Sequence, residues 1–244
     1  MGAIIGAACA SGCQDAVLKK ICEIEFQDVP ALLSPSWPSK GFFSGRKFVN
    51  LIHEIIPYDR IEDFPHPFAA IAVDLVEPRR VVLCSGPIDI ALRASSSIPV
   101  LFNPVERNNE ILVDGALIDP VPVSACRELG ADDVISVDLF ADRSRATKYK
   151  LDAGGRTTHE LAKISSAAQN IKERKKPGEA YSIADIAIES LAVAQRELAR
   201  LQSEISKPVF TFAPPVSDID VLDFHRGEET IDRSYQWARE KVPQ

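Results

Sequence analysis

The chain has 244 residues, of which 45% are hydrophobic and 26% charged, a composition typical of a folded protein with a large core. Its net charge of -7 at pH 7 and its pI of about 5.2 give no basic footprint, so nucleic acid is not expected as a partner. No apolar run reaches the roughly 18 residues of a membrane span, and the apolar start lacks the basic segment of a secretory signal. We therefore expect a cytoplasmic protein, with peripheral membrane contact left open.

The first twelve residues, MGAIIGAACASG, predict a buried helix that extends to about residue 20. Small side chains recur along it at helical spacing, which would let the helix lie close against a sheet. These are Gly2, Ala3, Gly6, Ala7 and Ala10. No Ser, Thr, Asp or Asn precedes them as a helix cap, so the sequence looks like the second half of a motif.

Strand and helix patterns alternate through the following 120 residues. We expect a loop at 29–45, a helix at 46–57, buried strands at 68–75 and 80–86, and a short helix at 87–99. Two strands flank the Asn108-Asn109 turn, and a helix with a second buried strand fills 123–140. This alternation predicts an α/β fold with a largely parallel central sheet.

A basic segment interrupts this order. Residues 143–179 hold ten Lys or Arg against four Asp or Glu, which indicates either a solvated, flexible insertion or a patch that directs the protein to anionic lipid headgroups or another acidic surface. The order then resumes with a helix at 182–205, a strand at 207–214 and a helix at 226–242. The 182–205 helix is expected to pack through Ala187, Leu191, Ala194, Leu198, Leu201 and Ile205. We expect one domain over 1–244, with a core at 1–142, the insertion, and a helix-strand-helix unit at 180–244.

The five cysteines show no Cys-x-x-Cys spacing and stand in apolar or helical contexts, so we expect them to be reduced and buried. They are Cys9, Cys13, Cys22, Cys84 and Cys126. Cys9 and Cys13 would share one face of the first helix, but no His or third Cys lies near them. The sequence gives no signal for a metal or a nucleotide cofactor.

Asp114 is the strongest candidate for a chemical role. It ends an apolar strand and is followed by Gly115, so the backbone can turn sharply and present the carboxylate at a sheet edge. Asp-Gly is also a common structural turn. Asp74 and Asp138 end predicted strands as well, and would either line the same crevice or cap the next helix.

The remaining polar candidates carry weaker signals. No histidine lies near a nucleophile-like motif, so we expect structural roles for His53, His66, His159 and His225. The serines at 95–97 have no glycine frame, and the chain contains no Gly-x-Ser-x-Gly elbow. Such an elbow is followed by small residues that begin a buried helix, which is the pattern of residues 1–7.

These segments resemble the bacterial patatin-like phospholipases, in the branch related to neuropathy target esterase. Residues 1–7 are similar to the residues after the serine in that family's Gly-x-Ser-[Met/Ile]-Gly-[Ala/Ser] elbow. Residues 91–105 resemble its Ala-Ser-x-Ser-x-Pro block, with Val100 where Gly is usual, and residues 112–139 resemble its Asp-Gly-[Ala/Gly] block. Further similarity at 40–57, 68–75 and 222–226 extends the resemblance over nearly the whole chain.

The resemblance implies a three-layer α/β/α fold and a Ser-Asp dyad in which Asp114 is the base, with no histidine. It implies acyl ester substrates: phospholipids, lysophospholipids or simpler esters. The family's nucleophile would stand directly before Met1, and its glycine-rich oxyanion loop and first strands earlier still. Because the 244 residues contain neither the serine nor the loop, we expect them not to hydrolyse esters by themselves. The alternative is a non-catalytic relative that binds lipid or protein.

Overall fold

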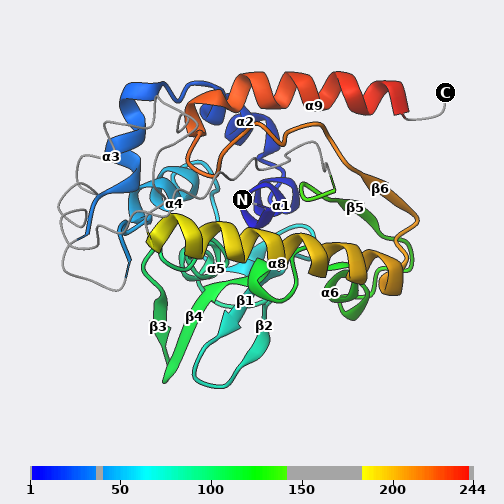
Figure 1. Cartoon of the computed structure of the whole chain (residues 1–244), viewed down its shortest axis with the longest axis horizontal. Helices are drawn as coiled ribbons and strands as arrows, with labels where there is room; N and C mark the ends of the chain where they lie inside the picture. The colour runs from blue at the N-terminus through cyan, green and yellow to red at the C-terminus, as the bar shows by residue number, and fades with distance from the viewer. Residues whose placement is uncertain (1, 37–40, 142–182, 242–244) are drawn as a thin grey trace, which may run out of the picture.

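The computed structural model describes residues 2–36, 41–141 and 183–241 (Figure 1). Its first helix is shorter than expected: α1 (Gly2–Ala10) is followed by a break and then α2 (Gln14–Cys22). Gly12, with φ +74°, adopts the left-handed conformation that ends the first helix. The prediction of one continuous helix was therefore wrong, and Cys9 and Cys13 lie on opposite sides of this break.

All five cysteines are free, but they are not buried as expected. Four of them are exposed, and Cys13 is half-buried. Helical or apolar neighbours in the sequence did not predict the burial of these cysteines. Each exposed cysteine lies on the solvent side of its segment.

The helices that follow agree with the sequence except in one place. The short helix η1 (Phe26–Asp28) precedes the predicted loop, and α3 (Val29–Leu33) lies within it. The helix α4 (Arg46–His53), the turn η2 (Ile61–Asp63) and the helix α5 (Ile88–Ser95) come next. Pro30 occupies the first turn of α3, where its missing N–H costs no hydrogen bond.

Four strands form the main sheet: β1 (Ala70–Asp74), β2 (Arg79–Leu83), β3 (Val105–Arg107) and β4 (Glu110–Asp114). Their order is β2-β1-β4-β3, and every pair is antiparallel. A short turn at 75–78 joins β1 to β2, and another at 108–109 joins β3 to β4. Connections of that length can join only antiparallel neighbours. The expected α/β class is confirmed, but the described main sheet is not parallel.

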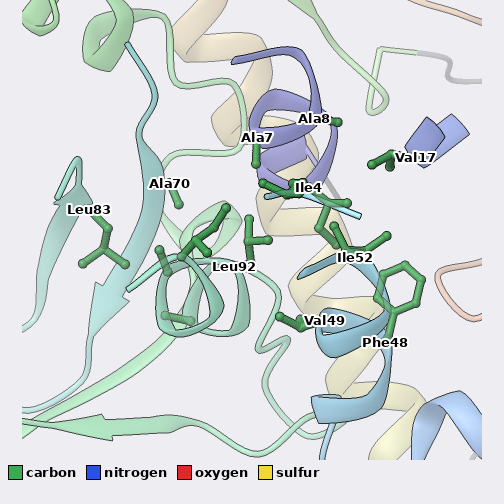
Figure 2. Packing of buried hydrophobic residues seen from close by; sticks show 14 of the residues in the cluster. Ile4, Ala7, Ala8, Val17, Phe48, Val49, Ile52, Ala70, Leu83 and Leu92 are labelled. Carbon is green, nitrogen blue, oxygen red and sulfur yellow. The ribbon is translucent and has the colours of Figure 1, made fainter. Parts of the chain in front are cut away.

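The hydrophobic core lies between this sheet and the first five helices (Figure 2). Ile4 of α1, Ile52 of α4 and Leu92 of α5 are fully buried in it. Ala7 and Ala8 are buried beside them, so the small side chains of α1 do allow close packing.

The second half of the chain adds η3 (Gly115–Leu117), α6 (Val123–Glu128), β5 (Ile135–Val137) and the long helix α8 (Ile183–Ser206). It ends with β6 (Phe210–Phe212), η5 (Phe224–Arg226) and α9 (Gly227–Lys241), which lies along the top of Figure 1. Strands β5 and β6 pair in parallel, apart from the main sheet. Among these described helices, none is both long enough and apolar enough to cross a bilayer.

Two expectations about this half were wrong. Helix α8 buries Gln195 and Ala199, whereas Leu201 and Ile205 of the predicted face are exposed. Strand β5, expected to be buried, exposes Ile135 over 65% of its surface. The cluster to which α8 contributes is small: Ala199 packs with Val121, Val123 and Val134, and neither Leu201 nor Ile135 belongs to it. The basic insertion at 143–179 lies outside the described residues.

Candidate functional site

Asp114 is the last residue of β4 and caps η3. Its Oδ1 accepts a hydrogen bond of 2.8 Å from the Ala116 N–H, and its own N–H donates one of 3.0 Å to the Ser97 carbonyl. At Gly115 the backbone of β1 comes so close that a Cβ atom would collide with the Ile71 carbonyl. The turn after β4 therefore requires glycine at position 115. This turn places the Asp114 carboxylate at the end of the strand.

The Asp114 side chain is buried, with only 9% of its surface exposed. Burial raises the pKa of this carboxyl group, and the hydrogen bond from Ala116 opposes the rise in part. A carboxylate with a raised pKa is a better proton acceptor near neutral pH than an exposed one.

Asp114 lines a cavity whose wall is mostly apolar. Helices α1, α3 and α4 contribute Ile4, Leu33, Phe48 and Val49 to this wall. Two aromatic rings from later in the chain, those of Phe102 and Phe224, complete it. An apolar cavity with a few convergent polar groups is the usual form of a small-molecule site. The first turn of α1 and the end of β4 thus border one cavity, although 110 residues separate them.

The polar part of the wall includes the end of α5, which the sequence did not indicate as part of a site. Arg93, Ser96 and Ser97 line the cavity together with Asp114. Ser97 Oγ donates to the Arg93 carbonyl over 2.7 Å and lies 3.0 Å from that of Asn103. Ser96 Oγ is buried and has no hydrogen-bond partner in the described part of the chain. The only sequence signal was the resemblance of residues 91–105 to a family block.

Asp74 and Asp138 do not line the cavity with Asp114, so the first of their two predicted alternatives, a shared crevice, is not what the structure has. Asp74 Oδ1 accepts hydrogen bonds from the Val76 and Ile111 N–H groups, at 3.0 and 3.1 Å. Burial would raise the pKa of Asp74, but these hydrogen bonds outweigh it and lower the pKa. Asp138 Oδ1 accepts one of 2.8 Å from the Phe140 N–H. Both side chains therefore cap turns, which is the structural alternative to a role in the crevice.

None of the described histidines is among the residues that line the Asp114 cavity. His53 Nε2 lies 3.3 Å from Asp59 Oδ1. The backbone N–H of His66 donates a hydrogen bond to the Ala10 carbonyl. The His225 ring packs edge-on against Phe26, with 5.1 Å between the ring centres. The fourth histidine, in the basic insertion, is outside the described residues. Within the described ranges no three His, Cys, Asp or Glu side chains gather as metal ligands.

Helices packed on a sheet, with a buried carboxylate at an apolar cavity, define an α/β protein with a site suited to an apolar ligand. The chain belongs to the patatin-like phospholipase family, whose model matches residues 1–127. This match contains most of the cavity wall, including Asp114 and the residues from α1, α3, α4 and α5, but not Val221 and Phe224.

Relatives in several organisms share this region. The chain is 32% identical over 139 residues to an uncharacterized NTE family protein of Mycobacterium tuberculosis, a match that covers 57% of this chain and 39% of the relative. It is 32% identical over 104 residues to lysophospholipase NTE1 of Cryptococcus neoformans, covering 43% of this chain and 6% of that protein. It is 31% identical over 126 residues to patatin-like phospholipase domain-containing protein 7 of rat, covering 50% and 9%. The matched region is thus a minor part of each relative's length.

Proposed function

We propose that this chain provides the general base and the acyl-binding wall of a serine acyl hydrolase that acts on phospholipids, lysophospholipids or simpler esters. The buried Asp114 carboxylate, which borders one cavity with the first turn of α1, supports this most strongly. The serine would stand directly N-terminal to Met1, where the family resemblance puts it. From that place its hydroxyl would enter the cavity beside Ile4, toward Asp114.

In this mechanism Asp114 accepts the proton of the serine hydroxyl while the serine oxygen attacks the ester carbonyl carbon. The tetrahedral adduct collapses, its ester C–O bond breaks, and the leaving alkoxide takes the proton from Asp114. A water then attacks the acyl-enzyme, with Asp114 again accepting a proton, and the fatty acid leaves as the serine recovers its hydrogen. Because the base works unprotonated and its pKa is raised, we expect kcat/KM to fall as the pH drops through that raised pKa.

The test uses the protein encoded in frame with codon 1 together with the sequence upstream of it. We expect a fluorophosphonate probe to label a serine directly before Met1, and Asp114→Asn to lower ester turnover by about 10²- to 10⁴-fold. Asp63→Asn, an exposed carboxylate in η2, is the matched control and should keep full turnover. A folded extended protein that is not labelled, or an Asp114→Asn variant with normal turnover, would contradict the proposal.

We also propose that the protein works in the cytoplasm and contacts membrane surfaces peripherally, since lipid esters reside in aggregates. Binding to vesicles that contain anionic lipid should be saturable and should weaken as salt is raised. Binding without any turnover by the extended protein would favour the alternative, a lipid-binding relative that does no chemistry.

A further inference from the structure

Arg93 is a charged group in an apolar setting. It lies on the last turn of α5, is half-buried, and lines the cavity that holds Asp114. Its guanidinium makes one long hydrogen bond, 3.4 Å to the Asn103 carbonyl, and no carboxylate of the described residues comes within ion-pairing distance. A guanidinium has five N–H donors, so most of its bonding capacity is not used by the described chain.

A second positive charge lies close to Arg93. Arg46 begins α4 next to Gly45, which lines the same cavity. Burial and the charge of Arg46 lower the pKa of Arg93, and only Asp89 acts against them. An arginine stays protonated under such a shift, so this border of the cavity carries positive charge that no ion pair among the described residues neutralises.

Arg93 is not placed to act on the catalytic base. Burial raises the pKa of Asp114 and the Ala116 hydrogen bond lowers it, and the charge of Arg93 is not among the causes of the shift. The pKa of Arg93 is likewise not shifted by Asp114. Both groups line the cavity, and neither is a cause of the other's pKa shift.

Ser96 adds a second unsatisfied group on the same side. Its Oγ is buried at the cavity wall without a partner, one turn of the chain beyond Arg93. Leaving a buried hydroxyl and a half-buried cation unpaired costs free energy, which a ligand with several acceptor oxygens would recover. A phosphate has this chemistry, and it pairs with arginine through two parallel hydrogen bonds.

We propose that Arg93, assisted by Ser96, binds the phosphate of an acyl ester seated in the cavity, so that the protein prefers phosphate-bearing esters over neutral ones. This inference rests on the proposed function for the identity of the apolar part of the ligand. The phosphate group itself could belong to a lipid headgroup or to free phosphate, and the two are separated by experiment.

Binding to the 244-residue chain tests the proposal without any need for turnover. Octyl phosphate, octyl glucoside and inorganic phosphate are titrated by calorimetry. We expect saturable binding of octyl phosphate that weakens with salt, weaker binding of octyl glucoside with no salt dependence, and the weakest binding of inorganic phosphate. Inorganic phosphate binding as tightly as octyl phosphate would overturn the lipid assignment.

Variants identify the residue. Arg93→Gln should weaken octyl phosphate at least 10-fold and leave octyl glucoside unchanged, whereas Arg239→Gln, an exposed arginine on α9, should change neither. Equal loss in both arginine variants, or equal loss of both octyl ligands, would overturn the proposal. If Arg93→Gln does not fold, Arg93→Lys decides: it keeps the charge but not the paired donors, so octyl phosphate should weaken selectively. Asp114→Asn should retain octyl phosphate binding, so failure of the hydrolase proposal and failure of this one give different results.

Discussion

The carboxyl group of Asp114 has a raised pKa in the folded protein because burial disfavours its charge. The folded state then binds more protons than the unfolded state between the two pKa values, so stability falls as the pH rises through that interval. We expect Asp114→Asn, which keeps an acceptor for the Ala116 N–H, to melt at a higher temperature than the parent at pH 8 and not at pH 3. Each 1 kcal/mol regained corresponds to roughly 2–4 °C for a chain of this size. An equal difference in melting temperature at both pH values would contradict this.

Some features of the individual site residues could be predicted from the sequence, and others could not. The place of Asp114 at the end of a strand could be predicted, because an apolar run followed by Asp-Gly is a local signal. Its role as a base remains a prediction. The contribution of Arg93 and Ser96 to the cavity could not be foreseen, because it depends on how α5 packs against β4. The Asp114-to-Ser97 hydrogen bond records that packing, and nothing local encodes it.

At the scale of elements, the segment between α5 and β3 is strained. Val100 has φ +73°, a conformation that β-branched residues strongly disfavour, and its carbonyl accepts a hydrogen bond of 3.3 Å from Phe42. We expect Val100→Gly to stabilise the protein by up to about 1 kcal/mol, since relief of a left-handed conformation is partly offset by the entropy of glycine. The midpoint of urea unfolding should rise. The matched Val105→Gly, in β3, should lower it, and a lower midpoint for Val100→Gly would show that the loop is not strained.

The direction of the strands was the main error at this scale. A buried apolar run looks the same in a parallel and an antiparallel sheet, so hydrophobic pattern alone could not decide. The short turns at 75–78 and 108–109 did indicate antiparallel strands, because parallel neighbours need a longer connection. Asn108 and Asn109 both have positive φ, as expected of a tight hairpin turn.

For the whole molecule, the exposed apolar surface around β5 and β6 sets the behaviour in solution. Ile135, Val137 and Val209 expose 65%, 58% and 66% of their surfaces, although parallel strands are normally covered on both faces. We expect the 244-residue chain to self-associate at micromolar concentration, as measured by sedimentation velocity. The double variant Ile135→Thr and Val137→Thr should reduce the association, whereas Val76→Thr, exposed at the β1–β2 turn, should not. A parent chain that stays monomeric would contradict this expectation.

The hydrogen bond from the Asp114 N–H to the Ser97 carbonyl has a consequence for altering this protein by design. It ties Ser97, just beyond α5, to the backbone of Asp114, so a replacement that moves the backbone at Ser97 will also move Asp114. Leu33 of α3 and Phe48 of α4, in the apolar wall, have no backbone hydrogen bond to Asp114 in the described part of the chain. A library intended to change the proposed acyl-chain preference should therefore vary those two helices first, where diversity can be added without breaking the hydrogen bond that holds Asp114.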